Sequence, residues 1–538
     1  MQEDDRSHPT IAAKAGAKVA RASVVIFIGQ ASSTVILSVA SMIIARLLGP
    51  ADYGSYSIAL SVAYLMLLFT DFGVNSALVR FAARFRSEER NELIQDLIET
   101  GIGFEFVTGL LMFLVSLFLA DILANSVVNR PSIVYLIQIA SPAILGSALL
   151  TTSSSIFVGL DEAKKAALLS ALSAMVKLIM APTLIILGLG VAGATVGHVL
   201  HLLIAGIIGA FAALKTARLP KHRSGTGSSF SARANLGPMV RYGMPLYASS
   251  LMGGFLSQFR TIVLPWFTSN TEIGNYSVAL VCSSAVVLLT TPIATALFPG
   301  FSELGSKNAT SDLRQFFLHS LRYTLFLVTP ASVFMAITSG DIVAVFYGSK
   351  YVQAQLYLRI YSATFLSAPF SLVLGSFYRG IGRTDIPLKA TLIDLSTTLP
   401  LLVALASVHG VIGAICATIV SGILPIIYVA RIAHREYGLE FDSRRVVKIL
   451  LASVISGAPS LAATLLPYPH IVNLVLAGTV FGATYLTVAP ILGAIGYEDL
   501  VNLRLILKDT GLIFKLSSVA LCYMERILSV VLARRIDY

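Results

Sequence analysis

Long apolar stretches recur along the whole chain, and they constrain the fold more than any other feature of the sequence. A helix needs roughly 20 apolar residues to cross a hydrocarbon core about 30 Å thick. Stretches this long and apolar indicate helices rather than barrel strands, because backbone inside a membrane must satisfy its own polar groups. Hydropathy predicts fourteen helices, near residues 22–46, 54–76, 94–120, 132–156, 166–187, 191–214, 239–266, 273–299, 315–338, 352–378, 386–407, 410–431, 446–466 and 471–494. We therefore expect an all-α integral membrane protein.

The charged residues support this interpretation and give an orientation. The chain is 56% hydrophobic and only 12% charged, with a net charge of +11. Its basic residues lie in short loops between apolar spans, which is typical of topogenic charge and argues against a nucleic-acid partner. An inner N-terminus leaves most of the 39 Lys and Arg residues in the inner segments. We expect a multi-pass protein of the cell (cytoplasmic) membrane with both termini in the cytoplasm.

Neither a metal centre nor a cofactor site is predicted. Cys282, Cys416 and Cys522 lie in apolar segments without metal-ligand spacing. His198 and His201 are three residues apart, but two ligands without a nearby Cys or carboxylate make a poor metal site. The glycine-rich loop that binds ATP phosphates is absent from the sequence. We expect a protein that is not an enzyme.

Short motifs recur at an offset of about 220 residues. Gly54–Leu60 reads GSYSIAL and Gly274–Leu280 reads GNYSVAL, while GVAGA at 190–194 returns as GVIGA at 410–414. Shared helix-packing composition is the plain alternative, since small residues are common in membrane helices. A duplication of six helices explains the matching order better. An even number of helices per copy predicts parallel repeats related by a pseudo-twofold axis along the membrane normal.

This duplication divides the chain into six parts. Two six-helix lobes with a cleft between them could rock, as alternating access requires, and two extra helices follow. Whether the run 511–524 inserts into the membrane or lies on its inner face stays open. The expected parts are a cytoplasmic N-terminal segment (1–21), an N-lobe (22–214), a basic Gly/Ser-rich cytoplasmic linker (215–238), a C-lobe (239–431), the extra helices (446–494) and an amphipathic cytoplasmic C-terminal segment (495–538).

The hairpin between the first two helices carries the most specific motif. Gly49 and Pro50 should end the first helix, because proline cannot continue its hydrogen-bond ladder, and Asp52 should cap the second. RLLGPADYG at 46–54, Phe72-Gly73 and ALVR at 77–80 resemble the polysaccharide-biosynthesis branch of the multidrug/oligosaccharidyl-lipid/polysaccharide exporter superfamily. The second-lobe motif at 273–279 and the Gly-rich turn at 380–384 fit the same resemblance.

The resemblance implies a fourteen-helix flippase for a polyprenyl-(pyro)phosphate-linked oligosaccharide. It also implies energy from an ion gradient or the membrane potential. The expected partners are this substrate, a coupling proton or sodium ion, membrane lipids and the glycan assembly machinery, around a monomer. An ion-coupled drug or metabolite exporter of the same superfamily is the alternative. A membrane-embedded glycosyltransferase or polymerase is more distant, because its chemistry needs a sizeable outer loop and the outer loops here are short.

Two ionisable residues at matching places in the two lobes are the strongest site candidates. An ionisable residue within a span is costly and usually faces a bundle interior or a wet cavity. Lys177 lies near mid-membrane on a small, polar face with Ser170 and Ser173, and could attract the substrate's pyrophosphate. Asp394 lies one turn from the matching position and could bind a coupling ion or restrain Lys177. A fixed Lys–Asp pair that braces the lobes is the structural alternative.

Four further residues complete the predicted site. Arg260 and Arg80 are candidate substrate ligands, although snorkelling of Arg260 to the interface and a topogenic role for Arg80 are alternatives. Glu105, near mid-depth, is a candidate proton or sodium site, against a hydrogen-bonded packing role. Asp71 joins Glu105 and Asp394 as a residue for ion coupling or for pairing the lobes.

Overall fold

The structure is a computed structural model that describes residues 11–217, 232–307, 310–507 and 512–536. The secondary structure in these ranges is helical, without a strand. Parts of three predicted segments, 1–21, 215–238 and 511–524, lie outside the described residues. The chain divides into two compact units, unit 1 up to Gly274 and unit 2 from Asn275 onward.

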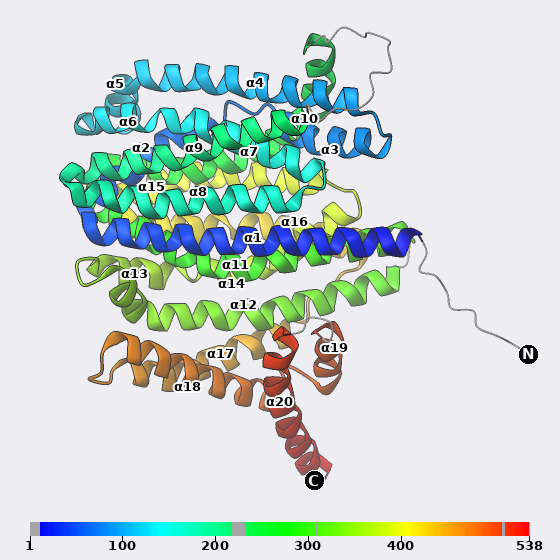
Figure 1. Ribbon diagram of the computed structural model, residues 1–538. Helices are drawn as coiled ribbons and strands as arrows, with labels where there is room; N and C mark the ends of the chain where they lie inside the picture. Colours follow the sequence, from blue (N-terminus) through cyan, green and yellow to red (C-terminus); the bar gives the residue numbers. More distant parts are fainter. Residues whose placement is uncertain (1–10, 218–231, 308–309, 508–511, 537–538) are drawn as a thin grey trace, which may run out of the picture. The chain divides into compact units, whose positions relative to one another are not determined.

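Unit 1 is a bundle of long helices around a core of aliphatic and aromatic side chains. Its centre includes Leu78, Ile98 and Phe157, which are at most 1% exposed. Helix α10, most of which falls in the predicted C-lobe, packs against α2 and α3 in this unit. The boundaries of the two lobes stay a prediction. The helices, labelled in Figure 1, are α1 (Ile11–Leu48), α2 (Pro50–Leu67), α3 (Val74–Ser87), α4 (Asn91–Phe118), α5 (Ala120–Ile122), α6 (Val134–Ala140), α7 (Pro142–Gly159), α8 (Ala163–Leu184), α9 (Gly190–Ala217) and α10 (Ala232–Val263).

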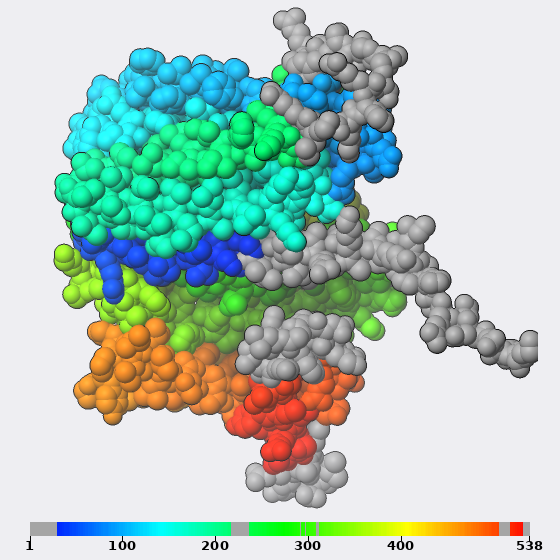
Figure 2. Space-filling model, viewed as in Figure 1, coloured from blue at the N-terminus to red at the C-terminus, as the bar shows by residue number. Residues whose placement is uncertain are grey.

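Unit 2 has its own core, which joins α12 to α17 and α18. The ring of Phe326 packs 5.2 Å from that of Tyr485, whose hydroxyl donates to the Phe326 carbonyl at 3.0 Å. In Figure 2 the orange surface of α17 and α18 adjoins the red surface of α20. The helices are α11 (Asn270–Ser306), whose first turn belongs to unit 1, α12 (Thr310–Tyr347), α13 (Val352–Tyr361), α14 (Thr364–Gly380), α15 (Asp385–Ser421), α16 (Ile423–Tyr437), α17 (Ser443–Thr464), α18 (His470–Ile491), α19 (Tyr497–Leu507) and α20 (Leu512–Ile536).

The helices are long and apolar enough to span a membrane many times. Within the described ranges, nine pass this test, or ten if the bent pair α13 and α14 counts as one span. Two of the stretches, Ala163–Thr216 with 54 residues and Asp385–Tyr437 with 53, are twice the length that one span needs. Apolar side chains such as Phe118, which is 78% exposed, lie on the helix surfaces as lipid contact requires. The chain is a multi-pass membrane protein, and fourteen spans stay a prediction.

The second predicted helix is broken. It starts at Pro50 with Gly49 as its N-cap and no side-chain cap bond, so the prediction that Asp52 caps it is wrong. The helix ends at Leu67, and α3 starts only at Val74. Between them Phe72 has a φ of 44°, which is unusual for a bulky residue. The Phe72 ring packs against Phe104 of α4 and Tyr247 of α10, which holds the break in place.

The first repeated motif lies at a backbone contact inside unit 1. A Cβ on Gly54 would be 3.0 Å from the amide nitrogen of Gly274, and a Cβ on Gly274 would be 3.0 Å from the amide nitrogen of Gly54. Both residues must therefore be glycine for α2 and the first turn of α11 to approach this closely.

The second repeated motif has the same backbone conformation in each unit. Gly190 has φ 50° and ψ −131°, and Gly410 has φ 56° and ψ −131°. These are values that L side chains rarely adopt, so glycine is required at both places. At each, the chain leaves one apolar helical segment and starts the next.

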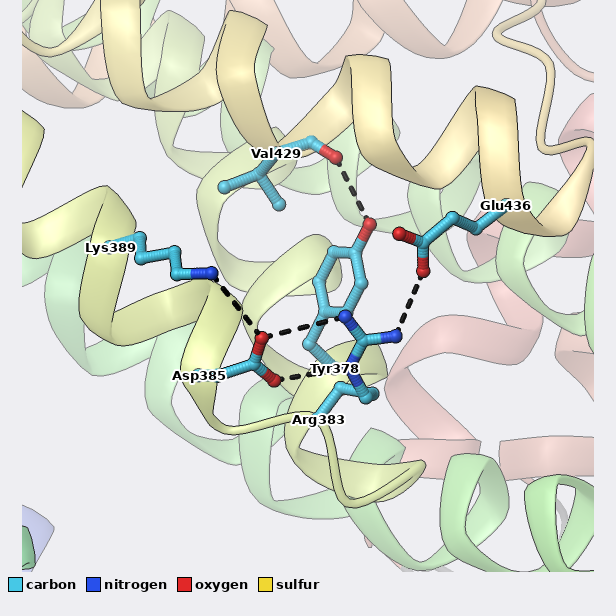
Figure 3. Close-up of polar contacts among 6 residues, drawn as sticks. All are labelled: Tyr378, Arg383, Asp385, Lys389, Val429 and Glu436. Carbon is cyan, nitrogen blue, oxygen red and sulfur yellow. Dashed lines mark hydrogen bonds and ion pairs between the residues drawn. The ribbon is translucent and has the colours of Figure 1, made fainter.

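Two polar networks join elements of unit 2. Figure 3 shows Arg383 donating to Asp385 at 3.1 Å and to Glu436 at 2.9 Å, which joins the turn before α15 to the end of α16. These hydrogen bonds raise the pKa of Arg383. Asp499 of α19 is 2% exposed and pairs with Arg322 of α12 and Arg445 of α17.

Candidate functional site

Lys177 is a buried cation without a counter-ion in its unit. It lies on α8, is 8% exposed, and donates one long hydrogen bond of 3.4 Å to Ser41 Oγ of α1. In the described part of unit 1, no carboxylate forms an ion pair with it. A charge in this setting is costly, because removing it from water costs several kcal/mol that one weak hydrogen bond does not offset. A counter-ion beside Lys177 would offset this cost.

Two histidines of α9 extend the polar surface beside Lys177. Both lie in electrostatic range of its ammonium group, and their rings are 4.7 Å apart. The His201 Nδ1 bonds to Ser173 Oγ at 2.9 Å, while the His201 Nε2 is buried without a partner. Ser173 belongs to the small, polar face that the sequence predicted for α8. His201 can therefore offer one free nitrogen toward the same region.

His198 is held more firmly than His201. Its Nδ1 bonds to the Tyr56 hydroxyl and its Nε2 to the Tyr64 hydroxyl, both at 2.9 Å. A neutral imidazole has one donor and one acceptor nitrogen, so two hydroxyls satisfy it fully. This arrangement fixes α9 to α2 and argues that His198 positions the site rather than binds a ligand.

Glu105 and Asp71, both predicted as ion-coupling residues, are brought together by Asn75. The Asn75 side-chain amide donates to Glu105 Oε1 at 2.9 Å, and the Asn75 backbone N–H donates to Asp71 Oδ1 at 2.8 Å. Glu105 is fully buried, and its Oε2 has no partner. Asp71 lies in the break between α2 and α3, so this acid cluster joins the break to α4.

The two arginines of the predicted site lie in different settings. Arg80 is exposed, and its guanidinium is 4.2 Å from the centre of the Tyr242 ring. Arg260 is partly buried, and its Nε has no partner. In the described part of unit 1, no hydrogen bond or ion pair joins either residue to Lys177, so their role as substrate ligands stays a prediction.

Asp394 belongs to unit 2. It lies on α15, where the Thr398 hydroxyl donates to its Oδ1 at 2.9 Å. It also lines a pocket of about 210 Å³ together with Ala390 and Thr391, and Ala390 is part of the face that the sequence predicted. No group of three or more His, Cys, Asp or Glu side chains in the described ranges is arranged to hold a metal ion.

Several residues of these clusters were not predicted. Asn75, Tyr56 and Tyr64 are ordinary polar residues in an apolar sequence, and their partners are 30 to 142 positions away. The sequence did offer one signal for the tyrosines, since Tyr56 and Tyr64 are eight residues apart and share a helix face.

Comparison with known proteins gives a family match and a fold match. A family model described as "Polysaccharide biosynthesis protein" matches residues 43–356, more than half of the chain. Among solved structures, a lipid II flippase MurJ in an inward closed conformation superposes with a TM-score of 0.70. It is 19% identical and the match covers 89% of this chain and all of that one, so the likeness concerns the fold.

Curated relatives include archaeal membrane proteins. An uncharacterised membrane protein of Methanocaldococcus jannaschii, MJ1068, is 23% identical over 81% of this chain and 88% of its own length. A Haloferax volcanii protein named "Probable flippase AglR" is 26% identical over 54% of this chain and 61% of its own length.

Proposed function

Because the chain belongs to the polysaccharide biosynthesis protein family, we propose that it is a flippase for a polyprenyl-(pyro)phosphate-linked oligosaccharide. The substrate would cross the cell membrane for the synthesis of a polysaccharide or another glycan. The relatives' names, which include a probable flippase, support this class of activity rather than an enzyme. The MurJ-like fold supports it as well.

Alternating access of two six-helix lobes is the proposed mechanism. Three observations support a duplicated architecture: the 220-residue offset of the motifs, the reciprocal contact of Gly54 and Gly274, and the shared backbone conformation of Gly190 and Gly410. A membrane-normal pseudo-twofold axis follows from such parallel repeats. Rocking of the lobes would expose one site first to the cytoplasm and then to the outside.

The buried ammonium of Lys177 is the main support for a substrate that carries a negatively charged pyrophosphate. A lipid carrier's pyrophosphate would supply the counter-ion that Lys177 lacks in unit 1, and His201 Nε2, once protonated, would add a donor. An exporter of organic cations would meet repulsion here instead. In the outward step, Asp394 would bind a coupling ion.

An ion gradient or the membrane potential would drive the cycle. A full charge that crosses the membrane gains about 2.3 kcal/mol per 100 mV. Asp394, Glu105 and Asp71 are the proposed ion-coupling residues, with a proton or sodium as the ion. A monomer that works beside the glycan assembly machinery, with both termini in the cytoplasm, completes the proposal.

Replacement of Lys177 by alanine tests this function. In cells that depend on the protein, Lys177→Ala should reduce surface glycan and raise the lipid-linked precursor in the inner leaflet, at unchanged protein level. Lys164→Ala, on the same helix but exposed, is the matched control and should leave both unchanged. If Lys177→Ala leaves both quantities unchanged, the anion site is wrong. If it instead reduces the efflux of a drug or metabolite, the exporter alternative replaces the flippase.

A further inference from the structure

The acid cluster of unit 1 has more hydrogen-bond acceptors than donors. Asn75 supplies two N–H groups, one to Asp71 and one to Glu105. Glu105 Oε2 and Asn75 Oδ1 are left buried without partners. Their residues are 0% and 8% exposed, so ordinary solvent contact does not satisfy these oxygens. An acceptor left unpaired in the interior costs about 1–3 kcal/mol, and more if it is charged.

We propose that Glu105 binds one exchangeable proton, and that this cluster is the coupling site of the transport cycle. The proposal rests on the flippase function above and names its ion. A proton on Glu105 Oε2 converts an unpaired acceptor into a donor and removes a buried negative charge. It can then hydrogen-bond to an oxygen of Asp71 or Asn75 in the same cluster.

In the part of the chain that the structure describes, no basic side chain near the cluster neutralises the charge of Glu105, so we expect a proton to do so. Asp71 is the acid that faces Glu105, and Tyr247 of α10 lies beside Asp71. Arg80, farther along α3, is stacked on Tyr242 and exposed. In the described ranges, no Lys, Arg or His forms an ion pair with either acid.

A sodium ion fits the cluster less well than a proton. Hard cations in proteins take about six oxygen ligands. Glu105 Oε1 and Asp71 Oδ1 each already accept an N–H group. Two free buried oxygens, Glu105 Oε2 and Asn75 Oδ1, are too few for such a coordination shell.

Asp71 gives the proton a route to Glu105 and connects Glu105 to the break between α2 and α3. Unlike Glu105, Asp71 is partly exposed, so protons can exchange through it. It lies in the α2–α3 break beside Phe72, whose φ of 44° is held by packing. Loss of the Glu105 proton creates two negative charges in one cluster, and their repulsion acts directly on the break. Proton occupancy thereby biases the angle between α2 and α3.

Infrared difference spectroscopy on the purified full-length protein tests proton binding without substrate. Wild-type protein should show the carbonyl band of a protonated carboxyl that disappears as pH rises. Glu105→Gln should abolish this band, and Asp71→Asn should shift its midpoint. Glu99→Gln is the control, because Glu99 is on the same helix, partly exposed and bonded to Gln95. A band that survives Glu105→Gln overturns the proposal, as does a band that sodium chloride, but not choline chloride, removes at fixed pH.

A second measurement tests coupling. In proteoliposomes with a lipid-linked oligosaccharide, an imposed pH gradient should change the flipping rate of wild type and of Glu99→Gln but not of Glu105→Gln. A retained response in Glu105→Gln contradicts the coupling role, even if flipping itself is confirmed. If wild type binds the proton but flips no lipid-linked substrate, the proposed function fails while the proton site stands.

Discussion

Gly54 and Gly274 lie against each other, and a Cβ on either glycine would be 3.0 Å from the amide nitrogen of the other. It would also overlap a backbone carbonyl oxygen, that of Asn270 for Gly54 and that of Pro50 for Gly274. The two glycines are the first residues of the two copies of the repeated seven-residue motif. The predicted twofold axis between the copies would produce a contact of this kind, in which equivalent residues meet each other. The strongest sequence repeat therefore coincides with a steric requirement, which gives its conservation between the copies a physical reason.

Alanine at either glycine should destabilise the protein. A Cβ at position 54 or 274 would force backbone apart, and overpacking of this kind costs about 1–3 kcal/mol. We expect Gly54→Ala and Gly274→Ala each to lower the melting temperature in detergent. Gly103→Ala is the control, since a Cβ there meets no atom within 4 Å. A Gly54→Ala protein as stable as Gly103→Ala would contradict the packing described.

Removing a tyrosine hydroxyl from the His198 network should also reduce stability. Tyr56→Phe leaves His198 Nδ1 without its partner, and Tyr64→Phe does the same for Nε2. A buried group left unsatisfied costs about 1–3 kcal/mol. Thermal unfolding of each variant measures this loss, with Tyr135→Phe, which is half exposed, as the control. Equal melting temperatures for all three variants would show that the network contributes nothing.

Loss of Asp499 should destabilise unit 2, because this buried carboxylate pairs with two arginines. Asp499→Asn would leave Arg322, whose side chain is only 17% exposed, without its carboxylate. Breaking a buried pair from one side costs about 3–5 kcal/mol. Asp385→Asn breaks an exposed pair with Arg383, where a change of at most about 1 kcal/mol is expected. Chemical unfolding of the two variants side by side checks the difference, and similar losses would argue against a buried clamp.

Cysteine labelling can test the orientation. On a background without Cys282, Cys416 and Cys522, a cysteine at Glu89 should react with an impermeant maleimide only after the membrane is permeabilised. A cysteine at Lys350 should react in intact cells. Both positions are exposed, so access alone does not separate them. The reverse pattern would invert the proposed topology and place the termini outside.

The sequence was most informative where one local property decides the outcome. The helix break near Gly190 was predicted between two apolar stretches, and the structure has it there. The burial of Lys177 followed from its apolar neighbours. The break at 68–73 was missed, because no charged residue interrupts the sequence from Gly54 to Thr70 and the conformation depends on Phe104 and Tyr247. The Asn75–Glu105 bond was missed for a similar reason, since it forms between two helices.

The shared core of α12, α17 and α18 has a mechanical consequence. The Tyr485–Phe326 contact and the Asp499 ion pairs attach α17 and α18 to the rest of unit 2. If the lobes rock as proposed, these two helices must displace lipid in every transport cycle. The viscosity of the bilayer would then limit the turnover rate. The protein should then run more slowly in a stiff, ordered membrane than in a fluid one, even with its substrate site unchanged.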